Sequence, residues 1–163
     1  MHEISIIQQK LACLLGQELW DGFDVGGIWC LRIGAKRMTI NRKQEEVEIS
    51  RYGLHISGEW RLWQNQRIII GSGDWFQPDP AGVERSALYS FLSSFWPQSL
   101  FIRSIQINAI GDVKLHLSKN YCLELLISST NSEYWRLIDD DNDEHFIVEA
   151  NDDEEEQADF DRS

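Results

Sequence analysis

The sequence predicts an α+β fold, a mostly antiparallel twisted sheet of about eight to ten short strands with two amphipathic helices. Apolar and polar residues alternate over residues 52–63, two other stretches carry apolar residues at helical spacing, and strands do not alternate regularly with helices. The chain has 163 residues, 42% of them hydrophobic, which is enough for one domain with its own core. We assign that domain to residues 1–149 and an acidic disordered tail to 150–163.

Two segments have the spacing of amphipathic helices. Residues 4–15 are expected to bury Ile4, Ile7, Leu11, Leu14 and Leu15, with Gly16 as the stop. A second helix is expected after Asp79-Pro80, a typical N-cap and first-turn pair, and before Pro97. Its apolar stripe would consist of Val83, Ala87, Leu88, Phe91, Leu92 and Phe95.

Strands are expected between these helices. Ile28–Ile33 and Met38–Asn41 are predicted to form a hairpin around Gly34-Ala35, and Val47–Ile49 begins another strand. The alternation from Tyr52 to Trp63 predicts one long strand that buries its even-numbered residues. With a loop at residues 64–66, the predicted pairs are Trp63 with Arg67, Leu62 with Ile68, and Trp60 with Ile70.

A meander and a final hairpin are expected after the second helix. The meander strands are Ile102–Ile110, Val113–Ser118 and Tyr121–Ser128, joined at Gly111-Asp112 and Lys119-Asn120. The hairpin joins Tyr134–Ile138 to His145–Glu149.

The net charge of −12 is concentrated at the C-terminal end. Residues 139–163 hold 13 acidic residues and one basic residue, whereas 1–138 balance 14 against 14. No Lys/Arg cluster suits phosphates, so we expect no nucleic-acid partner. No signal pattern or membrane-spanning stretch is present, and three scattered cysteines suggest buried free thiols. We therefore expect a cytoplasmic protein that does not contact a membrane, and leave its oligomeric state open.

Motifs for catalysis, metals or cofactors are absent from the sequence. There is no phosphate-binding glycine loop or nucleophile elbow, and the four histidines lack ligand spacing. Residues 139–143 resemble the start of a calcium loop, but Glu144 stands where glycine is needed and Ala150 where glutamate belongs. We expect no catalytic residue, no metal and no cofactor.

Two Trp-Arg-Leu triplets, 60–62 and 135–137, lie in predicted strands. Alternation places each tryptophan inward and each arginine outward, where it would pair with a carboxylate. The alternative makes Arg61 and Arg136 a pair that recognises an anion.

The candidate site is a protein-binding surface at the end of the 52–74 region. Its residues are Arg61, Trp63, Asp74, Trp75 and Phe76, a composition typical of binding hot spots, unless the second helix covers them. The alternative is a small-molecule or hydrolytic site on the polar sheet face, formed by His55, Arg61 and Asp74. The first hypothesis predicts a non-enzymatic protein-binding module.

The chain also resembles a family of uncharacterised bacterial cytosolic proteins. The likeness lies in Gly53-Leu54-His55-Ile56, Trp60-Arg61, residues 68–74, Trp135-Arg136-Leu137 and residues 145–148. The resemblance implies a bacterial cytosolic setting and no assigned activity. By analogy of class, small acidic α+β proteins of this kind include immunity proteins, so the expected partner is a protein of basic character.

Overall fold

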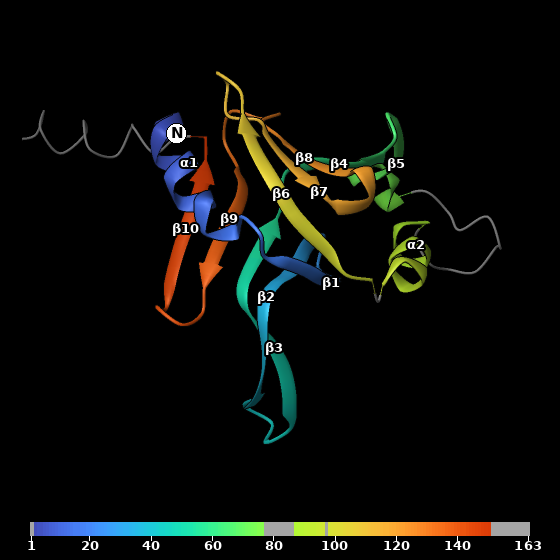
Figure 1. The fold of residues 1–163 in the computed structure, drawn as a ribbon, viewed down its shortest axis with the longest axis vertical. Coiled ribbons are helices and arrows are strands. Elements are labelled where there is room, and N and C mark those ends of the chain that lie inside the picture. Colours follow the sequence, from blue (N-terminus) through green and yellow to red (C-terminus); the bar gives the residue numbers. More distant parts are fainter. Residues whose placement is uncertain (1, 77–86, 97, 151–163) are drawn as a thin grey trace, which may run out of the picture.

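The computed structural model describes residues 2–76, 87–96 and 98–150 (Figure 1). Within these residues the strands form one antiparallel sheet in the order β10-β9-β3-β2-β1-β6-β7-β8-β4-β5. The mostly antiparallel sheet and its ten strands agree with the sequence prediction. Of the predicted tail, residues 150–163, all but Ala150 lie outside the described residues.

The first helix forms much as predicted. Helix α1 covers Ile4–Leu11 and continues into the 3-10 turn η1, Ala12–Leu14. Ile7, Leu11 and Leu14 are fully buried, while Leu15 is exposed. The chain leaves the helix at Gly16, whose φ of +76° suits glycine. Figure 1 shows α1 beside β9 and β10.

The prediction of two amphipathic helices against the sheet is wrong, because the second predicted helix does not form as a long amphipathic helix in the described residues. The described helix α2 is short, Ala87–Phe95, and the expected start at Asp79-Pro80 and Val83 lies outside the described residues. In the expected stripe Leu92 is buried, but Phe91 and Phe95 are only half-buried. Their rings stack on each other, and α2 contacts both the 3-10 turn η2, Ser72–Phe76, and strand β1, Glu18–Val25, while the ring of Phe95 lies edge-on to Tyr121.

The predicted hairpin around Gly34-Ala35 is also wrong. Strand β2 runs without interruption over Ile28–Ile40, and it pairs with β1, Glu18–Val25, and with β3, Glu46–Ile56. Gly34, with φ +83°, lies in a bulge between Ile33 and Lys36 that local sequence cannot distinguish from a turn. The turn before β2 is Gly26-Gly27 instead.

The predicted long strand at 52–63 is divided in two. Strand β3 ends at Ile56, and β4 covers Glu59–Gln64. The alternation was interpreted correctly, because Tyr52, Leu54, Ile56, Trp60 and Leu62 are all buried. The break is at Ser57-Gly58, where both N–H groups donate to the carbonyl of Tyr134. Strand β3 pairs with β2 and β9, whereas β4 pairs with β8 and with β5, Arg67–Gly71.

The β4–β5 turn is shorter than predicted. Asn65 and Gln66 both have positive φ, 48° and 64°, as a two-residue hairpin turn requires. This turn pairs Trp63 with Ile68, and a register shift between Trp63 and Leu62 then pairs Leu62 with Ile70, so the predicted pairing is wrong. As a result Ile68 is 64% exposed instead of opposing the buried Leu62.

The predicted meander and final hairpin are confirmed. The meander consists of β6, Leu100–Ile107, β7, Val113–Leu117, and β8, Tyr121–Leu126, and the turn η3 covers Ser118–Asn120. The hairpin joins β9, Glu133–Asp139, to β10, Glu144–Glu149.

The core lies between two halves of the curved sheet. The rings of Trp29 on β2 and Trp60 on β4 are 4.1 Å apart, although these strands are not neighbours in the sheet. The sheet therefore curls so that its two ends enclose one core. None of the helices in the described part of the chain is long and apolar enough to cross a membrane.

Candidate functional site

Three charged residues form a row across the outer face of neighbouring strands. Arg61 on β4 and Lys114 on β7 each lie directly opposite Glu124 on β8. The Nε of Arg61 donates to Oε2 of Glu124, and Nζ of Lys114 lies 3.2 Å from Oε1. Only 3% of Glu124 is exposed. A buried carboxylate is thus held between two cations whose side chains are about half exposed.

The charges of this row support one another. Burial raises the pKa of Glu124, but the hydrogen bonds from Arg61 and Lys114 outweigh it and hold the pKa below its ordinary value. The hydrogen bond to Glu124 in turn raises the pKa of Arg61. Both shifts favour the charged forms of Glu124 and Arg61.

A cavity of about 380 Å³ opens beside this row. Its lining combines the three charged residues with the β6–β7 hairpin: Arg61, Gln106, Ile107, Asn108, Asp112, Val113, Lys114, Glu124 and Leu126. The volume is in the range of small-ligand sites, and polar groups converge on it. Of the predicted site residues, Arg61 lines this cavity.

The other predicted partner-binding residues lie on β4 and in η2. Trp63 shares the outer face of β4, is half-buried, and has its ring edge-on to His116 at 6.4 Å. Asp74 accepts a hydrogen bond from the backbone N–H of Gly71 at 2.8 Å, so its described role is in a turn. Trp75 and Phe76 lie in η2, but their side chains are outside the described residues.

The residues of the alternative site, His55, Arg61 and Asp74, lie on three different elements, β3, β4 and η2. His55 lies on β3 opposite Cys30 and Arg136. Burial, followed by Arg136 and His145, lowers the pKa of His55. Within the described part of the chain no hydrogen bond or ion pair joins His55 to Arg61 or Asp74.

The two Trp-Arg-Leu triplets follow the simpler interpretation. Trp60 and Trp135 are buried, and each arginine pairs with a carboxylate. Arg136 binds both oxygens of Glu133, at 2.7 and 2.6 Å. The triplets lie on strands β4 and β9, which are not neighbours in the sheet, and each arginine contacts a carboxylate of its own, Glu124 or Glu133.

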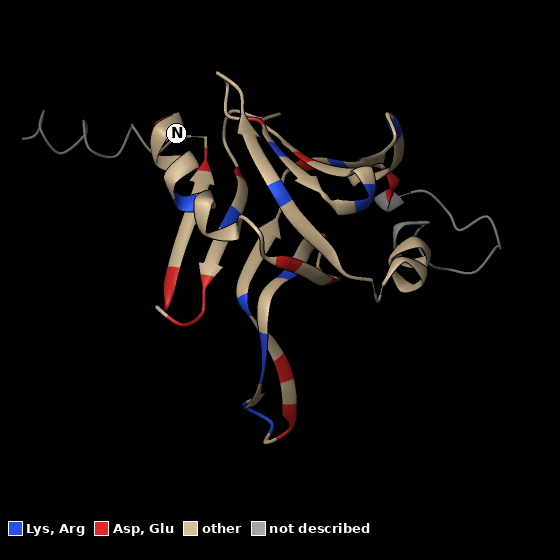
Figure 2. Cartoon of the chain, in the orientation of Figure 1, with Lys and Arg blue, Asp and Glu red and all other residues tan. Residues whose placement is uncertain are grey.

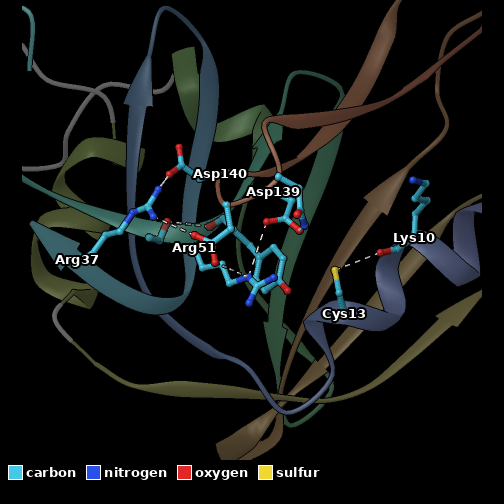
Figure 3. Close-up of polar contacts among 10 residues, drawn as sticks. Lys10, Cys13, Arg37, Arg51, Asp139 and Asp140 are labelled. Carbon is cyan, nitrogen blue, oxygen red and sulfur yellow. Dashed lines mark hydrogen bonds and ion pairs between the residues drawn. The ribbon is translucent and has the colours of Figure 1, made fainter. Parts of the chain in front are cut away.

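A second charged cluster joins the β9–β10 turn to β2 and β3 (Figure 3). Arg37 pairs with Asp140 and Asp141, and Arg51 lies 3.7 Å from Asp139 and 3.4 Å from Asp141. The aspartates of the segment that resembles a calcium loop are thus paired with arginines. Across residues 2–76, 87–96 and 98–150, no group of side chains has the arrangement of a metal site.

The cysteines differ in burial. Cys30 and Cys122 are buried as expected, but Cys13 is exposed and its Sγ donates to the carbonyl of Lys10 (Figure 3). Burial raises the pKa of Cys30 and of Cys122, to about 11 for Cys122, and partial desolvation together with the charge of Asp139 raises the pKa of Cys13. These shifts disfavour the thiolate that a nucleophilic cysteine needs.

A projecting ribbon that was not predicted from the sequence is formed by residues 36–50, which are the end of β2, the start of β3 and the turn between them; it is here called the arm. Pairing of β1 with β2 ends at Ile33, and pairing of β9 with β3 ends at Tyr52, so the arm extends beyond both neighbours (Figure 1). Local sequence does not distinguish the arm from a buried strand, because Met38 and Ile40 alternate with polar residues as in a strand that has one buried face. They are nevertheless 59% and 55% exposed.

Comparisons of the chain with protein-family models, curated proteins and solved structures found no match. The resemblance to an uncharacterised bacterial family therefore stays a prediction, and function has to be argued from the chain's own surfaces.

Proposed function

We propose that this protein is a non-enzymatic protein-binding module that docks a basic protein on one face of the arm. The observation that carries the proposal is the exposure of Met38 and Ile40 on the face of the arm opposite to Arg37, the residue that contacts the β9–β10 turn. Exposed apolar side chains grouped on one surface are typical of interaction sites.

The arm face continues the core-facing side of the sheet. Met38 lies opposite Glu48 and Ile40 opposite Glu46, so the four side chains share one face. By the period of two, this is the face on which Tyr52 buries its side chain further along β3. We define the arm face as Met38, Ile40, Glu46 and Glu48.

The charge of the arm face supports a basic partner. Glu46 and Glu48 are exposed, and no ion pair of either carboxylate is found among the described residues. Figure 2 shows acidic bands along the β3 side of the arm. A partner that places basic side chains around an apolar patch would satisfy both the apolar and the acidic residues.

The region around Trp63 remains a second proposed contact. Trp63 and Arg61 lie on the outer face of β4, whereas the arm projects from β2 and β3. The cytoplasmic location and the immunity-like role likewise remain proposals, supported by the acidic charge and not by any related protein.

The test is affinity capture with three variants of the full chain. Met38→Ser/Ile40→Ser removes the apolar residues of the arm face, and Glu46→Lys/Glu48→Lys reverses its charge. Ile110→Ser is the matched control, because Ile110 is equally exposed, at 59%, but lies on the β6–β7 turn. We expect a stoichiometric basic partner with the wild type and the control, and at least a tenfold loss with both arm variants.

Each variant must keep its melting temperature, since the substituted side chains are exposed and surface changes typically cost within about 0.5 kcal/mol. A captured partner that is acidic, or that binds the arm variants as well as it binds the control, would contradict the proposal.

A further inference from the structure

We propose that the cavity beside Glu124 binds an oxyanion, a carboxylate or a phosphate carried by a small molecule, with Arg61, Lys114 and Gln106 as its donors. This site is separate from the arm, because it lies on β4, β6, β7 and β8. The inference therefore does not depend on the proposed partner.

The acceptors in the cavity are already occupied. Both oxygens of Glu124 contact cations, Arg61 on one side and Lys114 on the other. Asp112 accepts from the N–H of Ile127 at 2.8 Å through Oδ1 and from the side-chain amide of Asn108 at 2.9 Å through Oδ2. The oxygen of the Asn108 amide accepts from the N–H groups of Ile110 and Asp112.

The donors are not fully used. The contact of Arg61 with Glu124 engages Nε, which leaves the two Nη groups of its guanidinium. Lys114 has three N–H donors and one described contact, with Glu124. Gln106 accepts from the ring of His116 through Oε1, which leaves its NH₂ group. What the cavity lacks is an acceptor, and an oxyanion supplies several.

The charge balance decides how such a ligand is held. Arg61 and Lys114 are offset by Glu124 and Asp112, so these four residues are neutral together. Attraction therefore comes from charge-assisted hydrogen bonds at short range rather than from a diffuse positive field. Binding of this kind persists at physiological salt, unlike the adsorption of anions to a basic surface.

The size of the cavity limits the ligand. A volume of about 380 Å³ is enough for a small molecule but not for a folded partner. The side chain of Leu126, two residues from Glu124 on the same face of β8, adds apolar surface beside the donors. The ligand class is thus a small organic carboxylate or phosphate ester with a short apolar body.

The experiment uses two titrations of the full chain, one with inorganic phosphate and one with butyrate, each monitored by two-dimensional ¹⁵N–¹H NMR. Sodium chloride keeps ionic strength constant at physiological level. In at least one titration we expect saturable chemical-shift changes of the backbone amides of Lys114, Glu124 and Gln106. Saturation with phosphate alone assigns a phosphate ligand, with butyrate alone a carboxylate, and with both a site that accepts either oxyanion.

Two substitutions separate binding from folding. Lys114→Gln removes a half-exposed cation and should raise the dissociation constant at least tenfold. Arg61→Gln should have the same effect, provided that its NMR spectrum is that of a folded protein. Arg103→Gln is the matched control, because Arg103 is an exposed cation on β6 that lies over the ring of Phe101 and does not line the cavity. The inference is overturned if neither anion saturates, or if Lys114→Gln binds as tightly as Arg103→Gln.

Discussion

Trp60 and Arg61 are neighbours on β4 whose side chains have opposite surroundings. Trp60 is buried against Trp29 in the core, whereas Arg61 is about half exposed and tied to the buried Glu124. Their contributions to stability should differ accordingly, one through packing and the other through a single charge-assisted contact.

Trp60→Ala should lower the free energy of unfolding by about 3–5 kcal/mol, because it leaves a large void between the halves of the sheet. Arg61→Ala should cost about 1–2 kcal/mol, because Glu124 loses one charged donor but keeps Lys114. Urea denaturation measures both. Equal losses would mean that the inward and outward assignment of β4 is incorrect.

Glu124 also makes stability depend on pH. Its pKa in the folded protein is below the ordinary 4.5, so the unfolded chain binds the proton more readily. The stabilisation is complete above about pH 4.5 and is lost as the pH falls through the lowered value. The Glu124→Gln protein should therefore lose less stability than the wild type between pH 5 and pH 3, measured by denaturation at each pH. A wild-type slope that persists in full in Glu124→Gln would contradict this assignment.

At the scale of elements, the β4–β5 hairpin contains avoidable strain. Gln66 has φ of 64°, a left-handed conformation that costs a non-glycine residue roughly 1 kcal/mol. Gln66→Gly should therefore raise the free energy of unfolding by about 0.5–1 kcal/mol.

The matched control for this hairpin is Arg67→Gly, at the next residue, which lies within strand β5. Glycine there should lower the free energy of unfolding, since it loses more entropy in an extended strand. The same sign for both substitutions would show that the turn is not of the left-handed type.

Much of the fold follows from local sequence pattern. The first helix, the meander and the final hairpin are each defined by short-range spacing and turn residues, and all three form. The errors arise where distant contacts decide. Gly34 lies in a bulge because β2 and β3 remain paired on both sides of it. Ser57-Gly58 separates two strands because the carbonyl of Tyr134 accepts from both N–H groups.

The candidate sites were less accessible to prediction for the same reason. Arg61 and Trp63 could be placed on a polar face by alternation, but Glu124 and Lys114 join Arg61 only through strand order. The arm could not be recognised, because Met38 and Ile40 have the pattern of a buried strand. Their exposure follows from strand pairing, because β1 stops pairing with β2 at Ile33 and β9 stops pairing with β3 at Tyr52, before either strand reaches the arm.

At the scale of the whole molecule, the charge of the chain is divided between a neutral body and an acidic end. Residues 1–138 carry no net charge, while the net −12 belongs to residues 139–163. Deletion of 151–163 removes seven carboxylates and one arginine. It should slow association with a basic partner by several-fold at low salt, because electrostatic steering is weakened, and the difference should vanish near 0.5 M salt.

Stopped-flow association rates of the full and shortened chains, measured at several salt concentrations, provide the test. Rates that are equal at low salt would show that these residues do not steer the partner.

The most direct test of protein binding through the arm is site-specific photo-crosslinking in cells of the native host. A photoreactive phenylalanine analogue replaces Met38, Ile40 or, as the matched control, Ile110 in the full chain, since all three side chains are similarly exposed. We predict one adduct of the same mass from positions 38 and 40, containing a basic protein, with little or none from 110 and a strong reduction when Glu46→Lys/Glu48→Lys is added. No adduct at 38 and 40, or equal crosslinking at all three positions, would contradict the arm as the binding surface.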